Sequence, residues 1–161
     1  MSPRPSWPQW PISLPFLVAA TYLACGDEPT GSPVAAGPFF PPDFLAGYIQ
    51  VRDCRLSIAH DSHNVRVFAS PGQADAYVDG VHPLASGAVF VKILYRDPDC
   101  ADLAAYLAMR KGAPDTAPEA GDWEWQEVDA AEKVLQSGPL PACISCHKSC
   151  AEGRDFTCAD P

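Results

Sequence analysis

The residues with the most specific chemistry lie near the carboxyl end of this 161-residue chain, where Cys143, Cys146 and His147 form a C-x-x-C-H motif. This spacing is typical of covalent c-type haem attachment, in which two thiols add to the haem vinyl groups and the adjacent imidazole binds iron. One helical turn can present both sulfurs along the edge of the porphyrin. The motif therefore predicts a haem c group attached at Cys143 and Cys146, with His147 as the iron ligand.

Two other uses of these cysteines compete with haem. A zinc site could add Cys150 to the motif, but structural zinc sites usually pair two separated sets of ligands, whereas these four ligands are crowded into a single short segment. A thioredoxin-like redox pair belongs near a βαβ unit and not close to the end of a chain. We therefore favour haem over both.

The position of the motif limits how an iron site could be completed. No methionine follows His147, so the downstream methionine that small electron-transfer cytochromes use as a second ligand is absent. Iron held by His147 alone would be open to a small molecule, which favours ligand binding or catalysis over electron transfer alone. Each remaining candidate is of a type more often found as an ordinary surface or core residue. These candidates are His60, His63, His82 and Met109.

Seven cysteines in 161 residues are many for a protein of the reducing cytosol. Outside the motif and Cys25, four cysteines remain, and four cysteines allow three different pairings. The pairs we expect, although the sequence does not fix the connectivity, are Cys54 with Cys100 and Cys150 with Cys158. Two disulfides require an oxidising compartment, so the cysteine content indicates an exported protein.

The amino-terminal segment has the layout of a secretory signal. An uncharged apolar run of 13 residues covers positions 12–24, and Arg4 is the only charge before it. This run is too short to cross a bilayer, which needs about 20 apolar residues. A short apolar run after a weakly basic start is typical of a signal that is removed on export.

The apolar run ends in Tyr22-Leu-Ala-Cys25, which resembles the lipobox of bacterial lipoproteins and predicts lipidation of Cys25. We expect a signal peptide with its lipobox over residues 1–25, a flexible tether over 26–40 and the haem domain over 41–161. Such an anchor would hold the protein in the bacterial cell envelope, on the periplasmic side, with no other membrane contact. The alternative is signal cleavage and a soluble periplasmic protein.

The charge of the chain argues against a nucleic-acid partner. Its 11 Lys and Arg against 20 Asp and Glu give a net charge of −9, and no stretch has more than two adjacent basic residues. Phosphate binding needs clustered basic side chains, so this function class is excluded. The length is that of one ordinary domain.

The middle of the chain predicts an antiparallel sheet. Residues 65–68 and 88–95 are rich in β-branched and aromatic side chains, and residues 122–128 alternate with a period of two. Residues 103–109 are ambiguous, because their composition favours a helix while their place between strands favours pairing.

Two helices are expected beside these strands. Residues 44–56 have the pattern of an amphipathic helix with Asp43 as its N-cap, and residues 72–78 favour a short helix. The fold class is therefore α+β, mainly an antiparallel β-sheet with a few short helices.

A charged residue interrupts two of the apolar strands. Lys92 shares a strand face with Phe90 and Leu94, so its ammonium must reach solvent, find a partner or serve a site. The competing interpretation is an edge-strand lysine that discourages aggregation. Arg66 raises the same question, and its strand could present a solvated face there.

Taken in chain order, five segments resemble the cytochrome P-460 family, and the resemblance extends over about residues 47–156. The family has a mainly antiparallel sheet with few helices, usually forms a dimer and carries one c-type haem. The segments are Gly87-Ala-Val-Phe-Val-Lys92, Met109-Arg-Lys111, Gly121-Asp-Trp-Glu-Trp125, Cys143-Ile-Ser-Cys-His147 and Asp155-Phe156.

The resemblance also implies roles for individual residues. Lys92 matches a lysine that forms an extra covalent bond to the porphyrin, and His147 matches the proximal iron ligand. Arg66 matches an arginine of the distal pocket, where a cation can stabilise negative charge on an iron-bound nitrogen ligand. Lys92 and Arg66 are thus the expected catalytic residues.

The characterised enzymes of this family oxidise hydroxylamine with the help of a distal carboxylate. That carboxylate would fall near Ala108, where no acid occurs, and Asp122 or Glu124 could approach from another strand. We expect a haem-dependent oxidoreductase for hydroxylamine or a related small nitrogen compound, with a periplasmic electron carrier as partner. Two alternatives are a nitric-oxide-binding protein of the cytochrome c′-beta kind, which has the same fold without the lysine bond, and a simple electron-transfer cytochrome.

Overall fold

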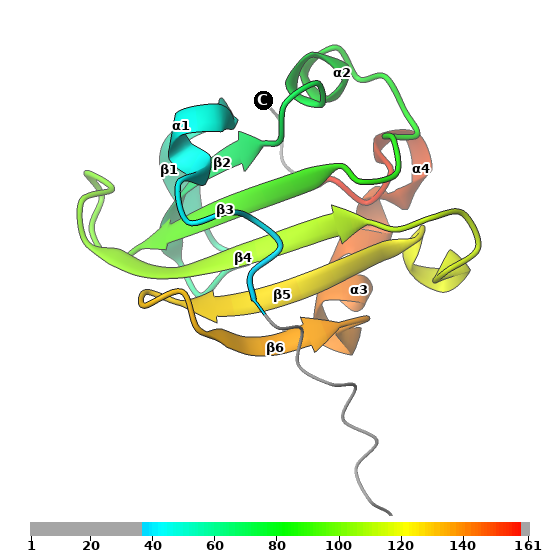
Figure 1. Cartoon of the computed structure of the whole chain (residues 1–161). Helices are drawn as coiled ribbons and strands as arrows, with labels where there is room; N and C mark the ends of the chain where they lie inside the picture. Colours follow the sequence, from blue (N-terminus) through cyan, green and yellow to red (C-terminus); the bar gives the residue numbers. More distant parts are fainter. Residues whose placement is uncertain (1–36, 159–161) are drawn as a thin grey trace, which may run out of the picture. The chain divides into compact units, whose positions relative to one another are not determined.

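The computed structural model describes residues 37–158, which form a six-stranded antiparallel sheet with short helices (Figure 1). The strand order is β1-β2-β3-β4-β5-β6, so each strand pairs with its neighbours in the sequence. The predicted α+β class, mainly an antiparallel sheet with a few short helices, is confirmed. The strands are β1 (Ile49–Ser57), β2 (His63–Ala69), β3 (Val89–Tyr95), β4 (Leu103–Lys111), β5 (Trp123–Asp129) and β6 (Val134–Gly138).

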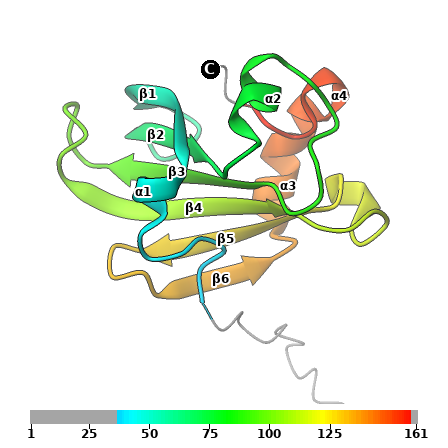
Figure 2. The same ribbon diagram turned by 45° about the horizontal axis from the view of Figure 1, so that its top comes forward.

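Helices lie on both faces of the sheet. In Figures 1 and 2, α1 lies on one face, whereas α3 and α4 lie on the other. The segment named α4 is not a regular helix, because Glu152 and Gly153 have non-helical backbone angles. The helical elements are α1 (Phe44–Gly47), α2 (Ala74–Val78), η1 (Pro118–Ala120), α3 (Pro141–His147), η2 (Lys148–Cys150) and α4 (Ala151–Arg154).

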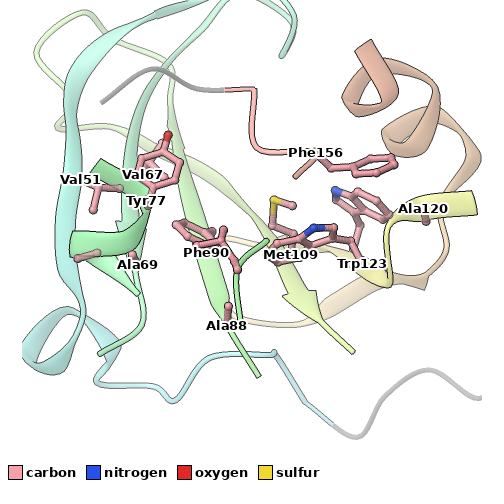
Figure 3. Close-up of a cluster of buried hydrophobic side chains, with 13 residues drawn as sticks. Val51, Val67, Ala69, Tyr77, Ala88, Phe90, Met109, Ala120, Trp123 and Phe156 are labelled. Carbon is pink, nitrogen blue, oxygen red and sulfur yellow. The ribbon is translucent and has the colours of Figure 1, made fainter. Parts of the chain in front are cut away.

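Each face of the sheet has its own apolar core. Successive side chains of a strand point to opposite faces, so one strand can supply both cores. The core beside α2 and α3 includes Tyr77, Phe90, Met109, Trp123 and Phe156 (Figure 3). The core on the opposite face includes Phe40, Phe44, Phe68, Val91 and Val128. Burial on both faces explains the nearly continuous apolar sequence of β3.

The three predicted strands are confirmed as β2, β3 and β5. The ambiguous segment 103–109 forms β4, because pairing with β3 and β5 on its two sides overrides the helix preference of its alanines. Strand β6 has no counterpart in the prediction. The short helix expected over residues 72–78 is present as α2.

The helix predicted over residues 44–56 is wrong. Only α1, four residues long, is helical, and Asp43 makes no side-chain capping hydrogen bond. The remainder is the edge strand β1, which pairs with β2 through two register shifts. These irregularities interrupt the period-two alternation, and this explains why the sequence resembled a helical pattern.

Both expected disulfides are present. Cys54 in β1 bonds to Cys100 in the β3–β4 connection, with a Cα–Cα distance of 6.0 Å. Cys150 bonds to Cys158 with a Cα–Cα distance of 5.2 Å. The first bond fastens the edge strand β1 to the β3–β4 connection, and the second closes a short loop within the carboxyl-terminal segment.

The predicted signal peptide and lipidation site, including Cys25, lie outside the described residues, as does most of the predicted tether. The last residues of that tether belong to the folded domain, because Phe40 is only 3% exposed in the core of the α1 face. Gln126 also holds this segment through hydrogen bonds from the Phe39 amide (2.7 Å) and to the Gly37 carbonyl (3.2 Å). Over residues 37–158, no helix is long and apolar enough to cross a membrane.

Candidate functional site

A cavity of about 290 Å³ lies between the sheet and α3. Its walls come from the five strands β2 to β6, from α3 and from the hairpin between β1 and β2. Most of the wall is apolar, which is usual for a site that holds a cofactor or a small molecule. The side chains that carry chemistry in this wall are His60, Lys92, Glu127, Cys143, Cys146 and His147.

Strand alternation places Lys92 in the cavity. Lys92 pairs in register with Val67 of β2 and Leu107 of β4, and both of these residues also line the cavity. Strand β3 is the third of six, so Lys92 is not an edge-strand residue. The interpretation of Lys92 as a residue that protects a sheet edge is therefore wrong.

Helix α3 carries the C-x-x-C-H motif. It begins at Pro141, where the missing amide hydrogen is tolerated, and runs to His147. Cys143 and Cys146 are free thiols and both line the cavity. Burial raises the pKa of Cys143, so this residue is a protonated thiol at neutral pH.

The His147 imidazole is held in one orientation. Its Nδ1 lies 2.6 Å from the Phe156 carbonyl oxygen, so Nδ1–H donates and the lone pair remains on Nε2. Burial lowers the pKa of His147, which favours the neutral ring. A neutral imidazole whose other nitrogen donates to a backbone carbonyl is the usual form of a metal-binding histidine. The Trp125 ring lies 5.7 Å from this imidazole.

Lys92 contacts a second imidazole. Its Nζ lies 3.2 Å from Nε2 of His60, and Nδ1 of His60 lies 2.8 Å from Ser57 Oγ. Burial, followed by the nearby charge of Lys92, lowers the pKa of His60 to about 4. Burial, followed by the charge of Arg52, lowers the pKa of Lys92 to about 8. At neutral pH the ammonium therefore donates to a neutral imidazole, and none of the ion pairs among residues 37–158 includes Lys92.

Two of the four candidates for a second iron ligand line the cavity, namely His60 and Met109. The other two histidines do not. His63 is engaged with the hairpin, where its Nδ1 lies 3.0 Å from the His60 carbonyl oxygen. His82 precedes a cis proline in the connection between α2 and β3.

Arg66 is not brought to the cavity. It pairs in register with Ile93, whose side chain belongs to the core of the opposite face. The Arg66 guanidinium lies 5.6 Å from the Tyr95 ring centroid, and its Nε is 3.5 Å from Asp53 Oδ1. Because Arg66 and Val67 are consecutive in β2, their side chains point to opposite faces. Arg66 therefore has no place in the candidate site.

Glu127 is the acidic residue that lines the cavity, and it was not among the site residues predicted from the sequence. Its Oε2 accepts a hydrogen bond of 3.0 Å from Gln136 Nε2. Asp122 is instead bonded to the Ala117 amide, and Glu124 pairs with Arg110. The alternation of β5 carried the missing signal, since Glu127 shares a face with the two tryptophans that precede it at intervals of two.

An unsatisfied donor adjoins the motif. Trp125 is only 4% exposed and lines the cavity, and its Nε1 has no hydrogen-bond partner. A buried indole N–H without a partner is costly, and a molecule bound in the cavity could supply the acceptor. The carboxylate of a porphyrin would be such an acceptor.

The donor set fits a c-type haem and does not fit zinc. Two free thiols and an imidazole with a free lone pair adjoin one apolar cavity. The zinc alternative required Cys150, which is held in a disulfide. Across the described range 37–158, no group of three or more His, Cys, Asp or Glu side chains is arranged to hold a metal ion.

Comparisons with known proteins assign no family. No protein-family model matches the sequence, and no curated protein matches it. Functional inference therefore depends on the residues of the cavity and on the motif that α3 carries.

Proposed function

We propose that this chain is an exported, lipid-anchored c-type haem protein that resembles cytochrome P-460 and oxidises hydroxylamine or a related small nitrogen compound. One observation carries the proposal: Lys92, which is distant in sequence from the motif, lines the same cavity as Cys143, Cys146 and His147. Haem would supply the redox-active iron. A periplasmic electron carrier would take up the electrons.

The three motif residues have separate tasks in this proposal. The thiols of Cys143 and Cys146 would form the two thioether bonds that hold the porphyrin. His147 would bind iron through Nε2, since Nδ1 is committed to the Phe156 carbonyl. The Trp125 Nε1–H would donate to a carboxylate of the porphyrin.

Lys92 supports a likeness to P-460 over a likeness to cytochromes c′-beta. A lysine can form a carbon–nitrogen bond only through its neutral amine, and a pKa of about 8 leaves about a tenth of Lys92 neutral at pH 7. An unperturbed lysine, with a pKa near 10.4, would be almost entirely charged. His60 accepts a hydrogen bond from Lys92 and so holds Nζ in the cavity.

Glu127 supports oxidation of the ligand over simple trapping. Removing electrons from hydroxylamine releases protons, and a positioned carboxylate can accept them. The contact with Gln136 fixes one carboxylate oxygen and leaves the other available. Glu127 would therefore take the role of the distal carboxylate, which the family resemblance implied near Ala108.

Nitric-oxide binding without turnover is the second candidate. Its support is the largely apolar wall of the cavity, which includes Phe90, Leu107 and Met109. Electron transfer alone would require His60 or Met109 to bind iron as a second ligand.

Spectra and turnover of the matured protein test these functions. The proposal predicts an absorption spectrum unlike that of ordinary c-type haem in the wild type, an ordinary c-type spectrum in Lys92→Ala, and hydroxylamine-dependent reduction of an added electron acceptor. Lys133→Ala, which changes an exposed lysine, is the matched control and should behave as the wild type. Binding of nitric oxide without turnover would support the second candidate, and a six-coordinate iron that ignores both compounds would overturn both.

A further inference from the structure

The segment Asp155–Cys158, which we call the C-terminal strap, supplies the acceptor for His147. Its Phe156 carbonyl oxygen lies 2.6 Å from His147 Nδ1. The strap follows α4 and is closed by the Cys150–Cys158 disulfide. The orientation of the imidazole therefore depends on where the strap is held.

Asp155 fastens the strap to three separate parts of the domain. Its Oδ1 lies 2.6 Å from Lys111 Nζ at the end of β4, and its Oδ2 accepts a hydrogen bond of 2.9 Å from the Leu84 amide. Its backbone carbonyl accepts one of 2.8 Å from Trp123 Nε1. The side chains of Lys111 and Asp155 are only 9% and 10% exposed, so removing either charge leaves the other buried and unpaired.

The strap is held in a conformation that it would not adopt by itself. Asp155 and Phe156 have φ angles of 45° and 64°, in the left-handed region that costs free energy for residues other than glycine. The Phe156 ring lies against Gly121, where an added Cβ would come within 2.5 Å of the ring. Such a backbone persists only while its surroundings fix it, so losing the ion pair would let the Phe156 carbonyl move.

We propose that Lys111 and Asp155 are positioning residues for His147, because they fix the carbonyl that selects the Nε2 lone pair for iron. This inference rests on the proposed function of His147. A donated Nδ1–H hydrogen bond makes an imidazole more basic and stabilises ferric iron. Loss of the pair would therefore weaken the iron–histidine bond and raise the reduction potential of the haem.

The test compares Lys111→Met and Asp155→Asn in the matured holoprotein, with the reduction potential and the iron–histidine stretching frequency as readouts. Positioning predicts that both variants raise the potential and lower the frequency. It also predicts that the double variant shifts them no further than either single variant, because both residues act through one carbonyl. Glu124→Gln, which breaks the neighbouring Arg110–Glu124 pair between β4 and β5, is the matched control and should leave both readouts unchanged.

A purely electrostatic effect would give a different result. Asp155→Asn leaves a positive charge near the iron and Lys111→Met leaves a negative one, so through-space charge alone would shift the potential in opposite directions. Opposite shifts, or an unchanged stretching frequency in both variants, would overturn the inference. Should Lys111→Met fail to fold, Lys111→Gln keeps a donor towards Asp155 and should give a smaller shift in the same direction.

Failure of the proposed function is distinguishable from failure of this inference. If the purified protein carries no haem, the proposed function is wrong. The positioning is then measured by nitrogen NMR of His147 in that same material. A single Nδ1–H tautomer in the wild type and mixed tautomers in both variants would support positioning, and unchanged tautomers would overturn it.

Discussion

Replacing Lys92 with methionine should stabilise the haem-free chain, although the substitution removes a charge. Haem attachment is prevented for this test by changing Cys143 and Cys146 to serine. In the folded chain the pKa of Lys92 is lowered from 10.5 to about 8, mainly by burial. The folded state thus disfavours the ammonium, whereas methionine fills a similar volume without that cost.

The size of the effect follows from the two pKa values. Below pH 8 both states carry the proton, and the shift costs the folded state about 3 kcal/mol at pH 7. As pH rises from 8 to 10.5 the folded state releases its proton first, so the wild type gains stability and the cost falls to about 1.5 kcal/mol at pH 9.5. The gain in the free energy of unfolding from Lys92→Met should therefore fall in parallel, from about 3 kcal/mol at pH 7 to about 1.5 kcal/mol at pH 9.5.

Urea unfolding at pH 7 and pH 9.5 measures this difference. The comparison between variant and parent cancels the other groups that titrate over the same range. Lys133→Met, at an exposed site, should change the free energy of unfolding by less than about 0.5 kcal/mol at either pH. A stability gain that does not depend on pH, or a loss at pH 7, would refute the assignment of Lys92 as a buried, destabilised cation.

Three further outcomes are expected. Removing the Cys54–Cys100 disulfide, which closes a loop with a sequence separation of 46, should lower the free energy of unfolding by about 4 kcal/mol, as measured in urea. Trp125→Phe should leave the stability of the haem-free chain unchanged or raise it by about 1 kcal/mol, because it removes an unsatisfied donor. The same variant should lower the melting temperature of the matured protein. A lower melting temperature in the haem-free chain alone would contradict this. Glu127→Gln should slow hydroxylamine oxidation by about 100-fold or more, while the affinity for nitric oxide stays within about threefold of the wild type. Equal losses of oxidation rate and of nitric-oxide affinity would indicate damage to the fold.

Local chemistry was readable from the sequence. The C-x-x-C-H motif depends on residues within one helical turn, so its thiols and imidazole could be identified without knowing the fold. The two disulfides were predicted with the connectivity that the structure has. Lys92 stood out because a cation within an apolar strand needs an explanation, and the structure supplies one in the cavity and in His60.

Features that depend on strand register could not be obtained in this way. A shift of one residue moves a side chain to the other face of a sheet. Arg66 lies on the face opposite Lys92, although the family resemblance implied that both belong to one pocket. Glu127 was overlooked because the alternation of β5 shows that it shares a face with Trp123 and Trp125, but not that this face borders the cavity. The strand β1 was mistaken for a helix because its register shifts interrupt the alternation. The strap depends on contacts between Asp155 and Lys111 that are distant in sequence.

The most direct test is mass spectrometry of the tryptic peptides from the matured protein, read together with its absorption. We predict that the peptide covering residues 134–148, which contains both motif cysteines, carries the mass of one haem. It should also be joined through Lys92 to residues 67–96, with cleavage after Lys92 blocked. A haem-bearing peptide with normal cleavage after Lys92 would show that the c-type haem is present without the lysine bond. Unmodified 134–148 peptide from colourless, iron-free material would contradict the central claim that the protein carries haem.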